Sequence, residues 1–151
     1  MAKRGNSKSV PPAKIAMAKA QPKATRTSVD TGQLSPKFSW KRADDQGPHG
    51  TWSELPFSDL HDIIVKFEDL EGSTRNDLLK QGSHAYTDPN KVSTEIYKAL
   101  TVLGEIENFE NLWSFRVGKN KTRVWALWIP PITHILWHDP NHKGCLSKDF
   151  K

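Results

Sequence analysis

The sequence has a single cysteine, Cys145, so it cannot form a disulfide bond within the chain. It contains no apolar run of the roughly 18–20 residues that a membrane-spanning helix requires, and its N-terminus lacks the apolar segment of a secretory signal. These absences argue against a disulfide-stabilised secreted domain and against a helical membrane protein. We therefore expect a cytoplasmic protein, a setting in which a lone cysteine stays reduced.

Acidic residues are scarce at both ends of the chain and abundant in its middle. Residues 1–35 carry seven basic side chains and one acidic side chain. Residues 113–151 carry seven basic and two acidic side chains. Residues 36–112 reverse this balance, with eight basic and fourteen acidic side chains. The asymmetry favours a polyanionic partner at the basic end of the folded part, with a solvated charged surface as the simpler alternative.

Apolar residues are also scarce in residues 1–35, and they follow no lasting periodicity. Low hydrophobicity with a high net charge cannot offset the entropy of ordering, so we predict a disordered basic arm. Such an arm can contact nucleic acid by releasing counterions. It can also fold as a short helix on a partner around Pro12–Ala20, or have no role of its own.

From residue 36 to residue 151 the composition is that of one folded domain. A short apolar run, Phe38–Trp40, is a candidate edge strand. Helical periodicity and capping residues then predict two or three helices. They run from a cap at Ser58 to Gly72, from Ser73 or Thr74 to Gly82, and from Asp88 to Gly104.

Three short runs rich in aromatic and β-branched residues follow, and they hold four of the six tryptophans. The runs are Leu112–Val117, Arg123–Ile129 and Ile132–Trp137, and turn-forming residues separate them, which predicts a three-stranded antiparallel meander. The middle run is apolar at nearly every position, as in a central strand with both faces covered. The order of elements predicts an α+β domain. In it the helices pack on one face of a small antiparallel sheet, and the other face stays partly open.

Two arginines are predicted to lie side by side at the end of the first hairpin. The period of two along Leu112–Val117 puts Arg116 on the face opposite the aromatic side chains, and Arg123 opens the next strand. Lys119 and Lys121 lie in the turn between them. Guanidinium groups bind phosphate with paired hydrogen bonds, so this group suits a phosphodiester. Ion pairs with acids on the helices are the structural alternative.

Histidines gather around the last predicted strand. His134 and His138 share a parity on it, and a turn at Asp139 brings His142 and Lys143 back toward the sheet end. A histidine can move a proton near neutral pH, although His134 can equally be an ordinary sheet residue. The tryptophans, which can stack on bases when exposed, can equally belong to the core. We predict as catalytic Arg116, Arg123, His138 and His142, and as nucleic-acid-binding Lys119, Lys121, His134 and Lys143.

The spacing of His138, Asp139 and His142 also invites a metal-site interpretation, because these residues can supply two or three ligands. No further ligand lies close in the sequence except Cys145, which is a weak candidate both as a ligand and as a nucleophile. We therefore predict neither a metal nor a cofactor.

Several of these segments resemble a family of small, largely uncharacterised bacterial proteins found among mobile-element genes. The matching segments are Ser114-Phe115-Arg116, Arg123-Val124-Trp125 and Leu136-Trp137-His138-Asp139-Pro140-Asn141-His142. The resemblance covers the chain from residue 36 to residue 147 and does not by itself name an activity.

More distantly, helices followed by an arginine-bearing meander are similar to the RelE/ParE superfamily of toxin–antitoxin toxins. The resemblance implies a ribosome-dependent mRNA endonuclease in which Arg116 and Arg123 hold the phosphate and His138 or His142 moves protons. RNA or the ribosome, and an antitoxin protein, would be its partners. The chain departs from the pattern by its greater length, its basic arm and the lack of a tyrosine after the last strand. The alternatives are a non-enzymatic nucleic-acid- or ribosome-binding module and a protein-interaction domain.

Overall fold

The computed structural model describes residues 31–118 and 122–146. The chain divides into two units after Thr31, and the second unit is Gly32–Lys151. The basic arm predicted for residues 1–35 lies almost wholly outside the described residues. The elements are η2 (Thr31–Gln33), β2 (Phe38–Ser39), α1 (Phe57–Glu71), α2 (Arg75–Lys80), β3 (His84–Tyr86), η3 (Pro89–Lys91), α3 (Thr94–Val102), η4 (Ile106–Asn111), β4 (Leu112–Arg116), β5 (Arg123–Ile129) and β6 (Ile132–Asp139).

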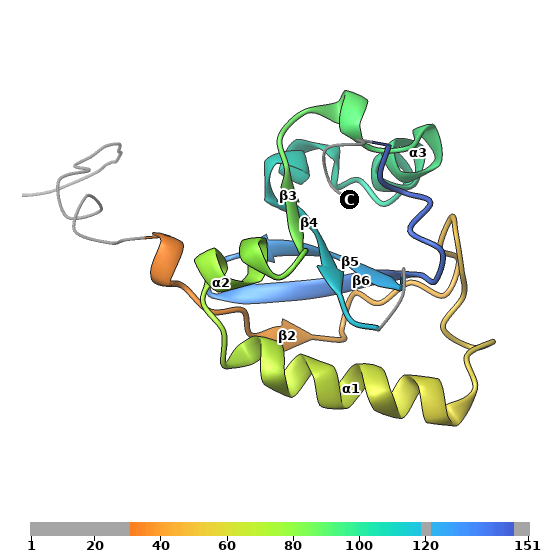
Figure 1. The fold of residues 1–151 in the computed structure, drawn as a ribbon. Helices are drawn as coiled ribbons and strands as arrows, with labels where there is room; N and C mark the ends of the chain where they lie inside the picture. Colours follow the sequence, from red (N-terminus) through yellow and green to blue (C-terminus); the bar gives the residue numbers. More distant parts are fainter. Residues whose placement is uncertain (1–30, 119–121, 147–151) are drawn as a thin grey trace, which may run out of the picture. The chain divides into compact units, whose positions relative to one another are not determined.

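One mixed sheet of five strands organises the domain, in the order β2-β6-β5-β4-β3 (Figure 1). Strands β4, β5 and β6 form the predicted antiparallel meander. The predicted edge strand is also present, as β2, but it pairs with β6 in the parallel direction. At the opposite edge β3 pairs with β4. The α+β class and the meander are thus confirmed, whereas the purely antiparallel sheet is not.

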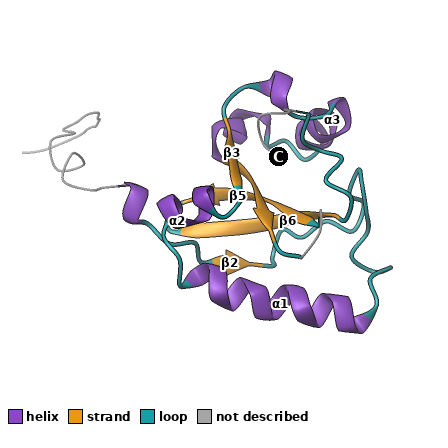
Figure 2. Ribbon diagram, viewed as in Figure 1, coloured by secondary structure: helices purple, strands orange, loops and turns teal. Residues whose placement is uncertain are grey.

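Helices cover both faces of the sheet, with α1 and α3 on opposite sides of the strands (Figure 2). On the face that we call the α1 face, Val124, Ala126 and Trp128 of β5 pack with Ile63 and Phe67 of α1. The alternating residues of β5 point to the other face, the α3 face. The expectation of helices on one face only was therefore wrong, because β5 is apolar at both parities and each parity has to be buried.

On the α3 face, Trp125 and Leu127 of β5 pack with Ile96 and Leu100 of α3. The chain after β6 folds back over the same face, and there it forms a single β-bridge between Val92 and Cys145. This face is thus covered by a helix and by a returning segment of chain.

The third helix is shorter than predicted. The 3₁₀ turn η3 ends at Lys91, the backbone is extended at Val92, and α3 starts only at Thr94. Ser93 caps α3 by accepting a hydrogen bond from Ile96 N, and its own N–H donates to the Gly144 carbonyl at 2.7 Å. The returning C-terminal segment therefore interrupts the helix, since it pairs with the backbone where a continuous helix would run.

Of the caps predicted for the first two helices, one was wrong and one is confirmed. Helix α1 begins at Phe57 after Pro56 and has no side-chain cap, so the predicted cap at Ser58 was wrong. Helix α2 has the predicted cap at Thr74, completed by Asp77 as a capping box. Across the described ranges, no helix combines the length and apolar character needed to cross a membrane.

Candidate functional site

Arg116 and Arg123 are direct cross-strand partners at the end of the β4–β5 hairpin, as the sequence predicted. Both lie on the α3 face, because they alternate with Phe115 and Val124 of the α1 face. Arg116 is exposed, whereas Arg123 is only 6% exposed. Lys119 and Lys121 of the connecting turn fall outside the described residues.

Burial is the main reason why the pKa of the Arg123 guanidinium is lowered, and the positive charge of Arg116 adds to the effect. Tyr86, Cys145 and Asp139 act in the opposite direction. Arg123 donates from Nη1 to the Thr122 carbonyl at 3.2 Å, but its buried Nε has no hydrogen-bond partner in the described part of the chain. Two neighbouring cations, one of them desolvated, are stabilised when an anion binds between them.

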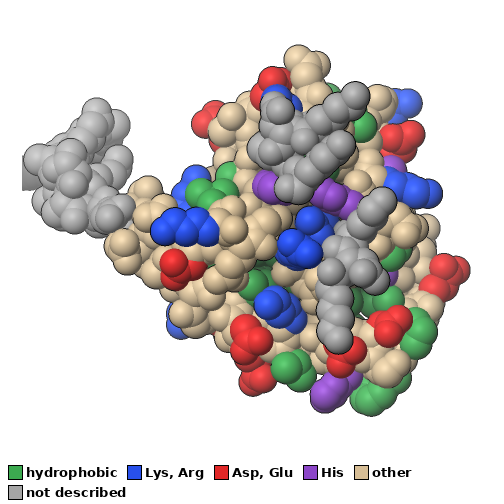
Figure 3. Space-filling view, viewed as in Figure 1, with side chains coloured by type: hydrophobic (Ala, Val, Ile, Leu, Met, Phe, Trp, Pro, Cys, Tyr) green, Lys and Arg blue, Asp and Glu red, His purple; other side chains and the backbone are tan. Residues whose placement is uncertain are grey.

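A pair of stacked histidines lies beside the arginines. The rings of His84 and His142 are 6.2 Å apart between centroids, with an interplanar angle of 15°. His84 is the register partner of Ser114, which lies two residues before Arg116 on the same face. Diagonal neighbours of this kind are separated by about 7–8 Å. Figure 3 shows histidine side chains next to Lys and Arg side chains near the middle of the viewed surface.

Asp139 holds the turn that carries His142. Its carboxylate is 1% exposed and accepts hydrogen bonds from Trp125 Nε1 at 3.0 Å, Lys143 N at 2.9 Å and Gly144 N at 2.8 Å. Gly144 is required there, because a Cβ would come within 2.5 Å of the Trp125 ring. The predicted return of the chain after Asp139 is thus confirmed for His142, and Lys143 is exposed in the same turn.

Tyr86 and Ser114 are buried polar residues close to the arginines. The Tyr86 hydroxyl and Ser114 Oγ share a hydrogen bond of 2.9 Å. Burial raises the pKa of Tyr86 above its ordinary value, and a hydrogen bond with the Cys145 thiol raises it further. Tyr86 is therefore a neutral hydroxyl at physiological pH, suited to orient its neighbours rather than to accept a proton.

His138 does not join this group, and the reason is a β-bulge. Trp125 pairs with Trp137 but Ala126 pairs with Ile135, so Leu136 is an extra residue in β6. His134 is opposite Leu127 on the α3 face, whereas His138 is opposite Val124 on the α1 face. The prediction that the two histidines share a face was therefore wrong, since the bulge shifts the alternation by one residue.

His138 is instead a packed histidine, 5% exposed, whose ring lies 5.5 Å from that of Trp52. Burial lowers its pKa, and the carboxylates of Asp139 and Asp59 partly offset this. Its Nδ1 is buried without a hydrogen-bond partner among the described residues. These surroundings favour a neutral structural side chain.

His134 is four residues from the Arg123 end of the sheet when measured along β5, or about 13 Å at the usual strand rise. Burial lowers its pKa, with a further contribution from Arg42 and an opposing one from Glu105. Arg42 and Glu105 form an ion pair of 2.7 Å. His134 thus belongs to a separate polar group, and the structure does not bring it to the arginine pair.

The sequence interpretation missed His84, Tyr86 and the structural role of Asp139. Residues 83–87 were assigned to no element, yet His84 and Tyr86 are two apart and point to one face of β3. That alternation was the available signal, although three residues are too few to make it convincing. In the described ranges no group of three or more His, Cys, Asp or Glu side chains is placed to hold a metal ion.

Comparisons of the chain with protein-family models, with curated proteins and with solved structures find no match.

Proposed function

We propose that the chain is a RelE-like toxin of a toxin–antitoxin system that cleaves mRNA at the ribosome without a metal ion. The observation that carries the proposal is the cross-strand pair Arg116–Arg123 with the stacked pair His84–His142 on the same face. Two guanidinium groups can hold a phosphodiester and stabilise the charge that develops on it during cleavage.

The cleavage step needs one group to take a proton and one to give a proton. The ribose 2′-oxygen attacks phosphorus, the bond from phosphorus to the 5′-oxygen breaks, and the products carry a cyclic phosphate and a 5′-hydroxyl. One imidazole of the His84–His142 pair accepts the 2′-hydroxyl proton, and the other donates a proton to the leaving 5′-oxygen. His142 keeps the role expected for it, His84 is added, and His138 is left out because it lies on the other face.

Primer extension on an mRNA in a purified translation system tests the proposal, with ribosomes present or omitted. We expect new 3′ ends that need both the protein and ribosomes. Replacing Arg116 or Arg123 with alanine should lower the cleavage rate by about 10²–10³-fold for each lost donor. His142→Gln and His84→Gln should also abolish cleavage, whereas His134→Gln, a matched change outside the group, should not. Unchanged mRNA with the wild-type protein would refute the nuclease.

A non-enzymatic nucleic-acid- or ribosome-binding module is the second candidate, and the charge distribution favours it. Seven basic residues and one acidic residue in 1–35 would add to the exposed Arg116 in holding a polyanion. This candidate predicts binding that weakens steeply with salt and an intact RNA after incubation. An antitoxin protein is a partner of the first candidate only, so co-purification of such a protein would favour the toxin.

A further inference from the structure

A cavity of about 270 Å³ borders Arg116 on the side of α1. It lies between the C-terminal half of that helix, the turn before β3 and the end of β4. The described residues that line it are Lys66, Leu70, Gln81, Ser83, Arg116 and Gly118.

The lining has the chemistry of an anion site. Among the described residues it offers two cationic side chains, one amide and one hydroxyl, and none of these six residues is acidic. Ser83 is 1% exposed, and its Oγ accepts the Arg116 N–H at 3.1 Å, which fixes the hydroxyl against β4. Lys66 makes no ion pair within the described residues, so its ammonium group is available to a ligand.

A glycine allows Arg116 to border this cavity. Gly82 has a φ of +100°, and a Cβ at this position would lie 3.2 Å from Arg116 Cδ and 3.3 Å from Nη1. Arg116 therefore lies across the turn at Gly82 while its backbone is paired with Arg123. One guanidinium group thus takes part in the arginine pair and also lines the cavity.

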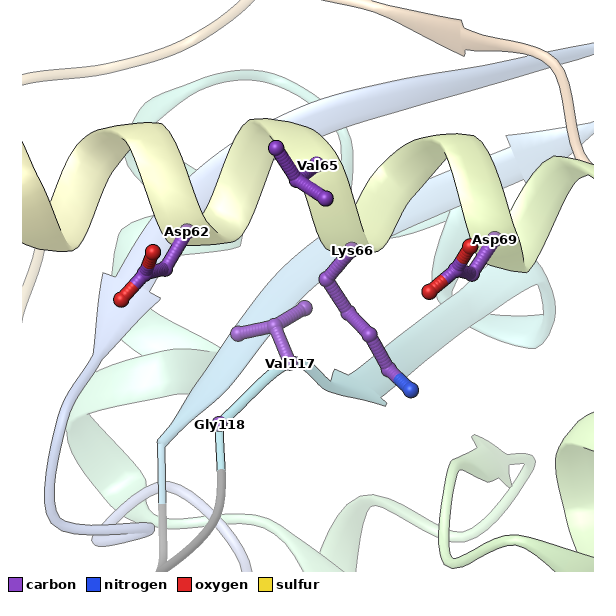
Figure 4. Close-up of a pocket in the computed structure, with 6 residues that line it drawn as sticks. All are labelled: Asp62, Val65, Lys66, Asp69, Val117 and Gly118. Carbon is purple, nitrogen blue, oxygen red and sulfur yellow. The ribbon is translucent and has the colours of Figure 1, made fainter.

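Acidic residues lie near Lys66 in a second hollow. This hollow, of about 760 Å³, is lined by Asp62, Val65, Lys66, Asp69, Val117 and Gly118. Figure 4 shows Lys66 reaching down from α1 alongside Val117, with the carboxylates of Asp62 and Asp69 on either side of it. A polyanion is repelled by these carboxylates, so the favourable path leads from Lys66 toward Arg116 rather than along the helix.

We propose that the Lys66–Arg116 cavity is a second phosphate subsite, which binds the backbone phosphate next to the one held by the Arg116–Arg123 pair. The ligand is a single nucleic-acid strand that passes from the His84–His142 pair over Arg116 to Lys66. This inference rests on the proposed function in one respect, namely that the substrate is a nucleic acid. Lys66 is then a positioning residue that binds substrate and takes no part in the proton transfers.

The salt dependence of binding tests the subsite. The affinity of the full chain for a single-stranded RNA oligonucleotide is measured over a series of salt concentrations. Each phosphate contact contributes about 0.7 to the slope of log K against log salt for single strands. We expect Lys66→Ala to reduce the slope by about 0.7 and Lys66→Arg to retain it. Lys98→Ala removes an exposed lysine from α3 and should leave the slope unchanged.

Cleavage kinetics give the second measurement. Lys66→Ala should raise KM for the RNA while kcat stays unchanged, because the subsite binds substrate equally in the ground state and the transition state. A slope that is the same in Lys66→Ala and wild type overturns the subsite even if the wild type cleaves RNA. A slope that depends on Lys66 supports the subsite even if no RNA is cleaved. In that case only the proposed nuclease activity is refuted.

Inorganic phosphate separates a nucleic-acid subsite from a site for a free anion. It is titrated into the labelled protein while the amide signals of Gln81 and Ser83 are followed by NMR. Shifts with phosphate that also appear with the oligonucleotide, and are lost in Lys66→Ala, support the proposal. Shifts with phosphate but no binding of the oligonucleotide overturn it in favour of a small-anion site. The absence of both overturns it outright.

Discussion

The two faces of the sheet are built from the same strands but differ in what they bury. On the α1 face β4 and β5 contribute Phe115, Val124 and Trp128 to an apolar layer under α1. On the α3 face the same strands end in Arg116 and Arg123, with Asp139 buried close by. Burial of apolar side chains stabilises a fold, whereas burial of a cation without an ion-pair partner costs free energy. Apolar burial on the α1 face, and on the α3 face away from this end, therefore supplies the stability that allows the end of the α3 face to be charged.

The largest effect on folding is expected from the α1 face. Phe115 is fully buried against Phe38 and Trp113. Phe115→Ala should lower the free energy of unfolding by about 3–5 kcal/mol, because it removes apolar contacts and leaves a cavity. Urea denaturation followed by tryptophan fluorescence measures the change. Val102→Ala, at an exposed position, is the control, and an equal loss in both variants would contradict the distinction between core and surface.

A smaller loss is expected from Asp139→Asn on the α3 face. The asparagine amide keeps one oxygen that can accept a hydrogen bond. Its NH₂ group, however, would face N–H groups that now donate to the carboxylate. We expect a loss of about 2–3 kcal/mol from the charged hydrogen bonds, and faster hydrogen exchange at Lys143 and Gly144. Exchange that stays slow at both amides would show that the turn does not depend on the carboxylate.

Arg123→Met should separate stability from function. The free energy of unfolding should stay the same or rise by up to about 1 kcal/mol, because a desolvated cation is replaced by an apolar side chain of similar length. RNA cleavage should nevertheless fall by about 10²–10³-fold. Parallel urea denaturation and primer extension measure both quantities. A large loss of stability would mean that Arg123 is a structural residue after all.

The smallest effect is a dependence on pH that comes from His138. Burial lowers its pKa from the ordinary value of 6.5, so the unfolded chain binds the proton more readily than the folded one. Stability should be complete above about pH 6.5 and should fall as the pH drops below it. His138→Gln should flatten this part of the profile, with the residual slope due to His134, whose pKa burial also lowers.

Local signals in the sequence predicted much of this fold. The tryptophan-rich runs gave the meander, Thr74 gave the start of α2, and the period of two placed Arg116 beside Arg123. These features depend on residues close together in the chain. The start of α3 was missed because it depends on the pairing of Val92 with Cys145, some fifty residues away in the sequence.

The candidate site was predicted only in part for the same reason. Its two arginines belong to one hairpin, so their proximity could be read from the spacing. His84 comes to His142 through the pairing of β3 with β4 and through the turn held by Asp139, and no local pattern records that contact. His138 was misplaced because a bulge leaves no mark in an apolar run such as Ile135-Leu136-Trp137.

That bulge also determines what a one-residue deletion in β6 would do. The Leu136 carbonyl accepts hydrogen bonds from Asp44 N at 2.9 Å and Trp52 Nε1 at 3.1 Å, so the inserted residue is anchored from outside the sheet. At this point the alternation of β6 side chains between the two faces shifts by one residue. Deleting Leu136 would close the bulge without moving a side chain to the other face, because Trp137 already lies opposite Trp125 and His138 opposite Val124. If β6 kept Leu136 in regular alternation instead, His138 would come opposite Arg123. The bulge, and not the length of β6, thus keeps His138 away from the arginines.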